Sequence, residues 1–516
     1  MDRRVFIKST AAVPLAAVAL EELAGGAERS FDPTEQSIAA LQRALSSGML
    51  TSEALVVAYL GRIARFDHHG PEHRSMLALN PDALTAARAL DQERKAGKVR
   101  GGLHGIPIVV KDNIETLDPM PTTAGSRALA RSLRLADAPL VSSLRAAGAI
   151  ILGKSNLSEW ANFRSTRSSS GWSGVGGQTR NAYARDRNPS GSSAGSAVAA
   201  AASFCAGAIG TETNGSILSP SSLNGLVGLK PTVGVVSSRG VVPISPRQDT
   251  AGPLCRTVED AAALISVIAE RPLGFGAHGK DLETFRLRGV RIGVMPVPAQ
   301  AHPQTPRVFA QARDVLQTEG AVLVDLKQPA GFEDMNQPER DALLYEFKAA
   351  INDYLATLDP GQVPSRNLAD LLAFNESHGN EELVIFGQEL FEMAQACGPL
   401  TDSAYLEARA RLQRDADTEG LAALFAQGVE VLLAPSNGPA ERIDELWGDR
   451  RTGGPSIASA AAIAGYPSLT APAGLISGLP IGITFIGQRN QDGLLLQVAR
   501  AYERTSAARV PPLLTA

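Results

Sequence analysis

Two glycine- and serine-rich stretches read Gly191-Ser192-Ser193-Ala194-Gly195-Ser196 and Gly210-Thr211-Glu212-Thr213-Asn214-Gly215-Ser216-Ile217. Glycine permits the tight turns that let a hydroxyl such as that of Ser192 or Ser216 point into a cleft. A helix beginning after the first stretch would aim unpaired N–H groups at the same place. Consecutive backbone N–H groups of the second stretch can converge as an oxyanion hole requires, and the candidates are those of Thr213, Asn214, Gly215 and Ser216.

A lysine supplies the candidate base for these serines. Lys111 ends the apolar run Ile106-Pro107-Ile108-Val109-Val110, so we expect partial desolvation to lower its pKa. A base active near neutral pH needs a pKa shift of about three units, which costs roughly 4 kcal/mol and requires substantial burial. No histidine lies between His104 and His278, so this segment has no imidazole base. The residues therefore indicate a Ser-Ser-Lys site in which Ser216 attacks, Ser192 relays the proton and Lys111 accepts it.

Each motif has an ordinary structural interpretation when it is taken alone. A lysine at a strand end can reach out to water, as long aliphatic side chains often do. A serine such as Ser192 can cap a helix, and the turn before Ser216 can be merely structural or bind an anion.

Two other pattern matches are better explained as coincidences. Residues 148–155 fit the phosphate-loop pattern GxxxxGK[ST], but the four central residues are apolar and predict a buried strand. Residues 191–195 fit the GxSxG nucleophile elbow, but the polar residues 184–189 before them are unlike the strand that an elbow requires. Nucleotide binding and an α/β-hydrolase fold are therefore disfavoured.

Composition limits the classes of protein that this chain can belong to. Hydrophobic residues make up 44% of the 516 residues and charged residues 20%, which allows a large core. The formal net charge of −4 gives no reason to expect nucleic acid as a partner. The odd set Cys205, Cys255 and Cys397 contains no CxxC and indicates neither a disulfide framework nor a zinc site. We expect no metal and no cofactor.

The N-terminus has the pattern of an export signal. Asp2-Arg3-Arg4-Val5-Phe6-Ile7-Lys8 is a twin-arginine motif, and the apolar run 11–20 that follows is too short to cross a bilayer of roughly 30 Å. Small residues offer cleavage sites near Ala19 or Ala27. We expect residues 1–27 to engage the twin-arginine export machinery, without membrane insertion, and the mature protein to be periplasmic or secreted. The alternative is an ordinary basic N-terminus on a flexible tail.

The rest of the chain, residues 28–516, is predicted to be one domain of helices and strands. Residues 31–100 and 330–450 are predicted to be mainly helical, and the second region is interpreted as an insertion or cap that shapes the substrate pocket. Individual predicted helices include 83–94 within the first of these regions, and 140–147, 196–203, 308–319 and 494–503 outside them. Predicted strands are 106–110, 149–152, 227–229, 291–295, 431–434, 468–471 and 481–486. This interleaving predicts an α/β fold whose sheet is covered on both faces.

The chain resembles the amidase signature family from about residue 35 to its C-terminus. The blocks that carry the resemblance are residues 191–196, 210–217 and Gly225-Leu226-Val227-Gly228-Leu229-Lys230-Pro231-Thr232, with supporting blocks at 105–113, 153–160, 177–181 and 478–482. The resemblance implies a single α/β/α sandwich around a large mixed β-sheet. It also implies that Lys111 is the catalytic lysine, Ser192 the bridging serine after a cis peptide bond, and Ser216 the acyl-forming nucleophile. The backbone N–H groups of residues 213–216 match the oxyanion hole.

Two positions depart from the family pattern. The family often has Gly-Gly-Ser-Ile-Arg at the nucleophile, whereas this chain has Asn214-Gly215-Ser216-Ile217-Leu218. Leu218 cannot pair with Glu212 as arginine would, so Glu212 needs another partner or a raised pKa. Pro189-Ser190-Gly191 lacks the common doubled glycine.

Within the family, the resemblance is strongest to bacterial peptide amidases, on blocks such as 158–164, 344–348 and 386–390. Such enzymes convert a C-terminal peptide amide to the free acid and ammonia, which implies a small peptide amide or another primary amide as substrate. One alternative is the amide-hydrolysing subunit of a tRNA-dependent amidotransferase, which would need partner subunits. The other is a non-catalytic binding protein on the same scaffold.

Overall fold

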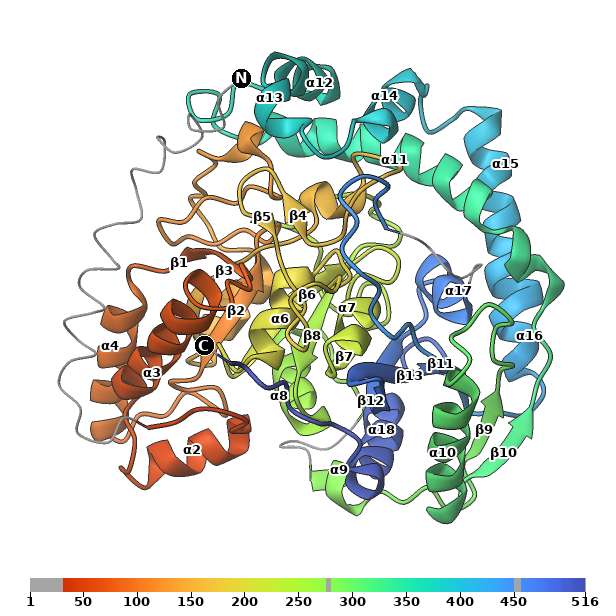
Figure 1. The fold of residues 1–516 in the computed structure, drawn as a ribbon, viewed down its shortest axis with the longest axis horizontal. Helices are drawn as coiled ribbons and strands as arrows, with labels where there is room; N and C mark the ends of the chain where they lie inside the picture. Colours follow the sequence, from red (N-terminus) through yellow and green to blue (C-terminus); the bar gives the residue numbers. More distant parts are fainter. Residues whose placement is uncertain (1–30, 275–279, 450–455, 516) are drawn as a thin grey trace.

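The structure, a computed structural model, describes residues 31–274, 280–449 and 456–515 (Figure 1). The predicted export signal, residues 1–27, lies outside the described residues. No helix among the described residues is both long enough and apolar enough to cross a membrane.

An eleven-stranded mixed sheet forms the centre of the fold. Its parallel pairs are β2 with β3 and β6, and β9 with β10 and β11, while the remaining neighbours run antiparallel. The strands lie in the order β1 (Met76–Leu79), β3 (Ile150–Ser155), β2 (Pro107–Lys111), β6 (Gly207–Glu212), β8 (Thr250–Cys255), β7 (Val227–Lys230), β12 (Ser468–Ile476), β13 (Leu479–Gly487), β11 (Val431–Pro435), β9 (Arg291–Val294) and β10 (Val322–Asp325).

Helices cover both faces of this sheet, which makes the fold the expected α/β/α sandwich (Figure 1). Helix α2 shows why they form: Ser37 caps its first turn, and Ile38, Leu41 and Leu45 recur at helical spacing and are buried. The helices associated with the sheet are α2 (Ile38–Ser46), α3 (Ser52–Ile63), α4 (Ala83–Lys95), α5 (Pro139–Ala146), α6 (Ala194–Ala201), α7 (Leu218–Leu223), α8 (Val258–Ile268), α9 (Lys280–Thr284), α10 (Thr305–Thr318), α17 (Ile457–Ile463) and α18 (Asp492–Ser506).

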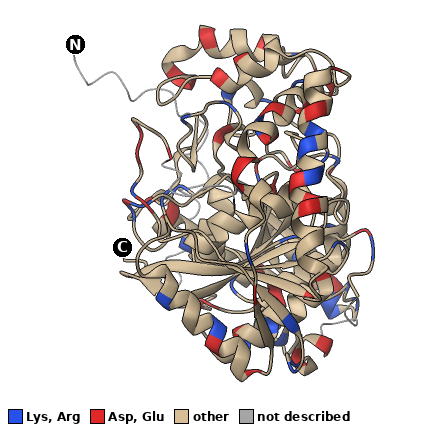
Figure 2. Ribbon diagram, turned by 90° about the vertical axis from the view of Figure 1, so that its right-hand side faces the viewer, with Lys and Arg blue, Asp and Glu red and all other residues tan. Residues whose placement is uncertain are grey.

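Helices dominate residues 330–450 and form an arc beside the sheet (Figure 1). They are α11 (Asn336–Ala356), α12 (Leu368–Ser377), α13 (Gly379–Glu382), α14 (Glu389–Ala396), α15 (Ser403–Leu412) and α16 (Ala422–Phe425). Phe347 and Phe391 of this arc pack with Trp160 and Phe163, which lie in the segment after β3. In the view of Figure 2, acidic residues predominate on the helices at the top, and acidic and basic residues occur together on the helix at the right.

Four strands of the sheet were not among the predicted ones: β1, β6, β8 and β10. Strand β1 corrects the mainly helical prediction for residues 31–100, because Met76–Leu79 pairs at the edge of the sheet with β3. Strands β6 and β8 contain glycine, which has a low strand propensity, so residue propensities do not predict them. Close packing requires it here: a Cβ on Gly210 would lie 2.6 Å from Ser193 Oγ, and one on Gly252 would lie 2.0 Å from the Leu229 carbonyl oxygen.

The structure supports the rejection of both pattern matches. Residues 150–155 of the phosphate-loop match form the buried strand β3, and Lys154 makes a buried ion pair with Asp112 at 3.0 Å. Residues 184–190, before the GxSxG match, are described as turns and loop with one isolated bridge at Arg187 and no strand. Neither a phosphate loop nor a nucleophile elbow is present at these positions.

Candidate active site

Three chain segments carry the candidate residues and meet at the carboxyl ends of two neighbouring strands inside the sheet. Lys111 is the last residue of β2, and Glu212 is the last residue of the neighbouring parallel strand β6. Because the carboxyl ends of adjacent parallel strands lie at the same edge, the turn after β6 that carries Ser216 lies near Lys111. Ser192 precedes helix α6, which begins at Ala194.

Lys111 is wholly buried and contacts Ser192. Its Nζ lies 2.8 Å from Ser192 Oγ, 2.9 Å from Thr211 Oγ1 and 3.4 Å from the Thr211 carbonyl oxygen. Burial lowers the pKa of Lys111 to about 7, although the negative charges of Asp249 and Glu212 act in the opposite direction. An amine with this pKa is substantially uncharged near neutral pH and can accept a proton from the Ser192 hydroxyl.

Tight packing surrounds the Ser192 backbone. The peptide bond between Gly191 and Ser192 is cis, and the Ser192 carbonyl accepts a 3.0 Å hydrogen bond from Ser158 N. A Cβ on Gly191 would lie 2.1 Å from Ser158 Oγ, so only glycine fits before Ser192 without rearrangement. Ser192 itself is fully buried.

The backbone of Ser216 is hydrogen-bonded to Ser193, the residue that follows Ser192. Ser193 N donates a 3.2 Å hydrogen bond to the Ser216 carbonyl, and Ser193 Oγ contacts both backbone groups of Thr211. Ser216 retains 8% exposure, whereas Ser192 and Lys111 have none. Among the hydrogen bonds of the described residues, none joins the hydroxyls of Ser192 and Ser216. The structure therefore links Lys111 directly to Ser192, and Ser216 to the same segment through its backbone.

The backbone N–H groups around Ser216 fall into two sets. Those of Ile217 and Leu218 donate to Glu212 Oε2, at 2.7 and 3.0 Å. In the described part of the chain, no hydrogen bond is donated by the backbone N–H groups of Thr213, Asn214, Gly215 and Ser216. Gly215 has a φ of +81°, which glycine adopts without strain. The four candidate oxyanion donors are thus unoccupied by protein acceptors.

Glu212 has hydrogen-bond partners although the arginine common at position 218 in the family is absent. Its Oε2 is held by the two N–H groups at the start of α7, so the carboxylate fixes the turn after Ser216. Lys230 is buried nearby, and burial lowers its pKa to about 8 while the charges of Glu212 and Asp492 oppose that change. The two backbone donors thus satisfy Oε2 in place of an arginine at position 218, while the buried Oε1 has no hydrogen-bond partner among the described residues.

Several residues that contact the site were not found from the sequence. Thr213 Oγ1 donates to Asp249 Oδ1 at 2.6 Å, and Asp249 Oδ2 accepts from the N–H groups of Ile244 and Ser245. Burial raises the pKa of Asp249 to about 6. Asn214 Nδ2 donates to Glu339 on α11. No local motif marks Asp249 or Glu339, because they lie 36 and 125 residues from their partners.

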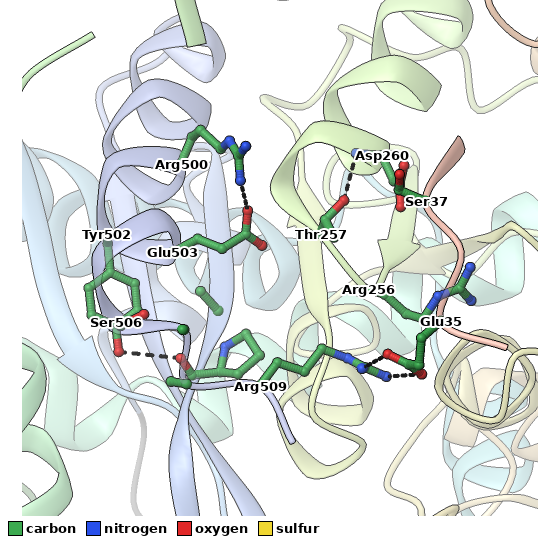
Figure 3. A pocket seen from close by; sticks show the side chains of 14 residues that line it. Glu35, Ser37, Arg256, Thr257, Asp260, Arg500, Tyr502, Glu503, Ser506 and Arg509 are labelled. Atoms are coloured by element: carbon green, nitrogen blue, oxygen red, sulfur yellow. Dashed lines mark hydrogen bonds and ion pairs between the residues drawn. The ribbon is translucent and has the colours of Figure 1, made fainter. Parts of the chain in front are cut away.

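A separate cavity of about 280 Å³ lies between α8, α18 and the C-terminal tail (Figure 3). Its lining includes the charged pairs Glu35 with Arg509 and Arg500 with Glu503, but not Lys111, Ser192 or Ser216. Within the described residues, no group of three His, Cys, Asp or Glu side chains is placed to hold a metal ion. The candidate catalytic residues therefore lie at the carboxyl ends of β2 and β6 and do not line this cavity.

The chain is similar to several known proteins over most of its length. The Amidase family profile matches residues 54–496. A similar solved structure is the native peptide amidase from Stenotrophomonas maltophilia, which is 46% identical, has a TM-score of 0.88, and is matched over 94% of this chain and 99% of that one. A probable amidase of Arabidopsis thaliana is 38% identical over 94% of this chain and 92% of its own length. A glutamyl-tRNA(Gln) amidotransferase subunit of Myxococcus xanthus is 34% identical over 91% of this chain and 97% of its own length.

Proposed function

Since this chain belongs to the amidase signature family of amide-hydrolysing enzymes, we propose that it hydrolyses C-terminal peptide amides or similar primary amides with a triad of Lys111, Ser192 and Ser216. The observation that carries the proposal is the contact of a wholly buried lysine amine with Ser192 Oγ at 2.8 Å. No structural role requires an uncharged amine there, whereas proton transfer from a serine does.

The reaction begins with acyl transfer to Ser216. Uncharged Lys111 accepts the proton of Ser192, which accepts the proton of Ser216 as Ser216 Oγ bonds to the amide carbon. The developing oxyanion is bound by the free backbone N–H groups of residues 213–216, and each such donor typically contributes roughly 3 kcal/mol in the transition state. The relay then returns a proton to the amide nitrogen. The C–N bond breaks, ammonia leaves, and an acyl ester on Ser216 remains.

Water completes the cycle along the same relay. It attacks the acyl carbon while Ser192 accepts its proton and passes one to Lys111, and the bond between the acyl carbon and Ser216 Oγ then breaks. Ser216 regains its proton and the free acid is released. The balance is one amide and one water consumed, with one acid and one ammonia formed.

The peptide-amide substrate class is supported by the resemblance to the Stenotrophomonas peptide amidase over nearly the whole of both chains. We expect the purified chain alone to release ammonia from peptide amides, with the matching free acid detected by mass spectrometry across a panel of C-terminal residues. If the protein hydrolyses simple aliphatic amides but no peptide amide, the substrate class would be simple aliphatic amides instead.

The amidotransferase relatives favour a second candidate, an amide-hydrolysing subunit that acts only in a complex. The same assay separates the two. Ammonia release by the isolated chain supports an independent amidase. Activity that appears only with partner subunits and charged tRNA would make this chain such a subunit.

We also propose export through the twin-arginine route, on the strength of the sequence Asp2–Lys8 alone. Replacing Arg3 and Arg4 together with lysine should retain the protein in the cytoplasm, because the export machinery reads the arginine pair. Fractionation of cells that express the full chain measures this. Equal periplasmic amounts of the wild-type and double-lysine proteins would contradict it.

A further inference from the structure

One helix of the outer arc reaches back to the loop that precedes Ser216. Glu339, in the first turns of α11, accepts from Asn214 Nδ2 with both carboxylate oxygens, at 2.8 and 2.9 Å. Gln248 Nε2 donates to Glu339 Oε1 at 2.9 Å and to the Thr213 carbonyl at 3.3 Å. A single carboxylate therefore ties two neighbouring loops to the helical region.

The same helix makes a second attachment two turns later. Glu346 accepts hydrogen bonds from Ser245 Oγ and, at 2.8 Å, from Tyr405 OH. Residues seven apart lie on one helix face about 10.5 Å apart, so Glu339 and Glu346 face the same way. Ser245 N also donates to Asp249, whose other oxygen accepts from Thr213. Helix α11 thus holds the 244–249 loop through both Glu339 and Glu346, and the 213–214 turn through Glu339.

Burial makes these attachments specific. Glu339 is 7% exposed and Glu346 is 3% exposed. A buried carboxylate requires donors, because its unsatisfied charge is costly. Asn214 lies where the sequence departs from the glycine common in the family, and its side chain spans the distance to α11. The departure has a structural use: it adds a side-chain anchor to a turn that also contains Gly215.

We propose that Glu339 is a positioning residue that acts through Asn214 and Gln248 to hold the backbone N–H groups of residues 213–216 in the geometry of the oxyanion hole. The proposal rests on the function proposed above. Oxyanion donors act only when they are already aimed at the developing charge, and a misplacement of about 1 Å can cost roughly 100-fold in rate. Glu339 does not contact substrate in this account.

The test is a double-mutant cycle on ammonia release from a dipeptide amide. Glu339→Ala and Asn214→Ala should each lower kcat by roughly 10- to 100-fold with KM nearly unchanged, since only transition-state binding is lost. Because both remove the same anchor, the double variant should be about as slow as the slower single variant. Glu339→Gln, which keeps an acceptor for Asn214, should retain intermediate activity. Asn214→Ala keeps its own backbone N–H, so the donor itself is not deleted.

Two controls separate a positioning role from a loss of folding. Glu333→Ala removes an exposed carboxylate just before α11 and should leave both kinetic constants unchanged. Labelling of Ser216 by a fluorophosphonate should slow in the Glu339→Ala variant even under conditions where its urea unfolding curve shows it fully folded. Multiplying effects in the double variant, or a rise in KM at constant kcat, would overturn the proposal. An inactive wild-type protein would instead contradict the proposed function, so the two failures are distinguishable.

Discussion

Replacing Ser216 with alanine should abolish ammonia release from peptide amides, with a fall in kcat of roughly 10⁴-fold or more. The variant removes the only protein atom proposed to bond to the amide carbon, and no acyl ester can form without it. The fold should persist, because Ser216 is held against Ser193 through its carbonyl, which alanine also has. Ammonia release under saturating substrate measures the loss.

Covalent labelling provides an independent readout of the same assignment. A fluorophosphonate should modify the wild-type protein once, at Ser216, and should leave the Ser216→Ala variant unlabelled. Ser142→Ala, which changes an exposed serine on α5, is the matched control and should be labelled and active like the wild type. Retained turnover by Ser216→Ala would remove Ser216 from the nucleophile role. An unlabelled, inactive wild type would favour the non-catalytic scaffold.

The strands that are easiest to predict from the sequence are those made of continuous apolar residues. Residues 106–110 and 431–434 have the pattern of buried strands and form β2 and β11. Strands β6 and β8 could not be found in this way, because Gly210 and Gly252 are required by backbones and side chains that approach from other elements. Such contacts are properties of the assembled sheet and leave no local pattern. The strand leading to Ser216 was therefore missed while the turn after it was recognised.

The residues of the candidate site likewise fall into those marked by a local motif and those that depend on distant contacts. Lys111 and Ser192 lie in local motifs, and the structure places the amine of one against the hydroxyl of the other. Glu339 carries no motif, since its role depends on α11 returning to the sheet 125 residues after Asn214. The question about Glu212 has a local answer: its Oε2 accepts from the N–H groups of Ile217 and Leu218, five and six residues later, where α7 starts. The sequence predicts the reacting groups, and the fold supplies the groups that contact them.

Replacing Lys111 with methionine should abolish the pH-dependent part of catalysis. In the wild type, Lys111 must be uncharged to accept a proton, and its pKa is about 7. The rate should therefore fall in acid through a single ionisation near that pH and level off above it. The Lys111→Met variant fills a similar volume without the amine, so its residual rate should lack this ionisation. Lys98→Met, at an exposed lysine, should keep the wild-type profile. An unchanged acid limb in Lys111→Met would exclude the lysine as the base.

The same substitution should change stability in a direction opposite to activity. The folded-state pKa of Lys111 is about 7 and its ordinary value is 10.5, so the unfolded chain binds the proton more tightly between these values. Wild-type stability from this group therefore rises with pH across that window, and the full cost of roughly 5 kcal/mol applies below pH 7. The difference in unfolding free energy, Lys111→Met minus wild type, should be largest in acid and decline toward pH 10.5. Taking the difference cancels other buried groups such as Lys230. A difference that does not vary with pH would mean that the folded protein keeps Lys111 charged, and the proton relay would lose its acceptor.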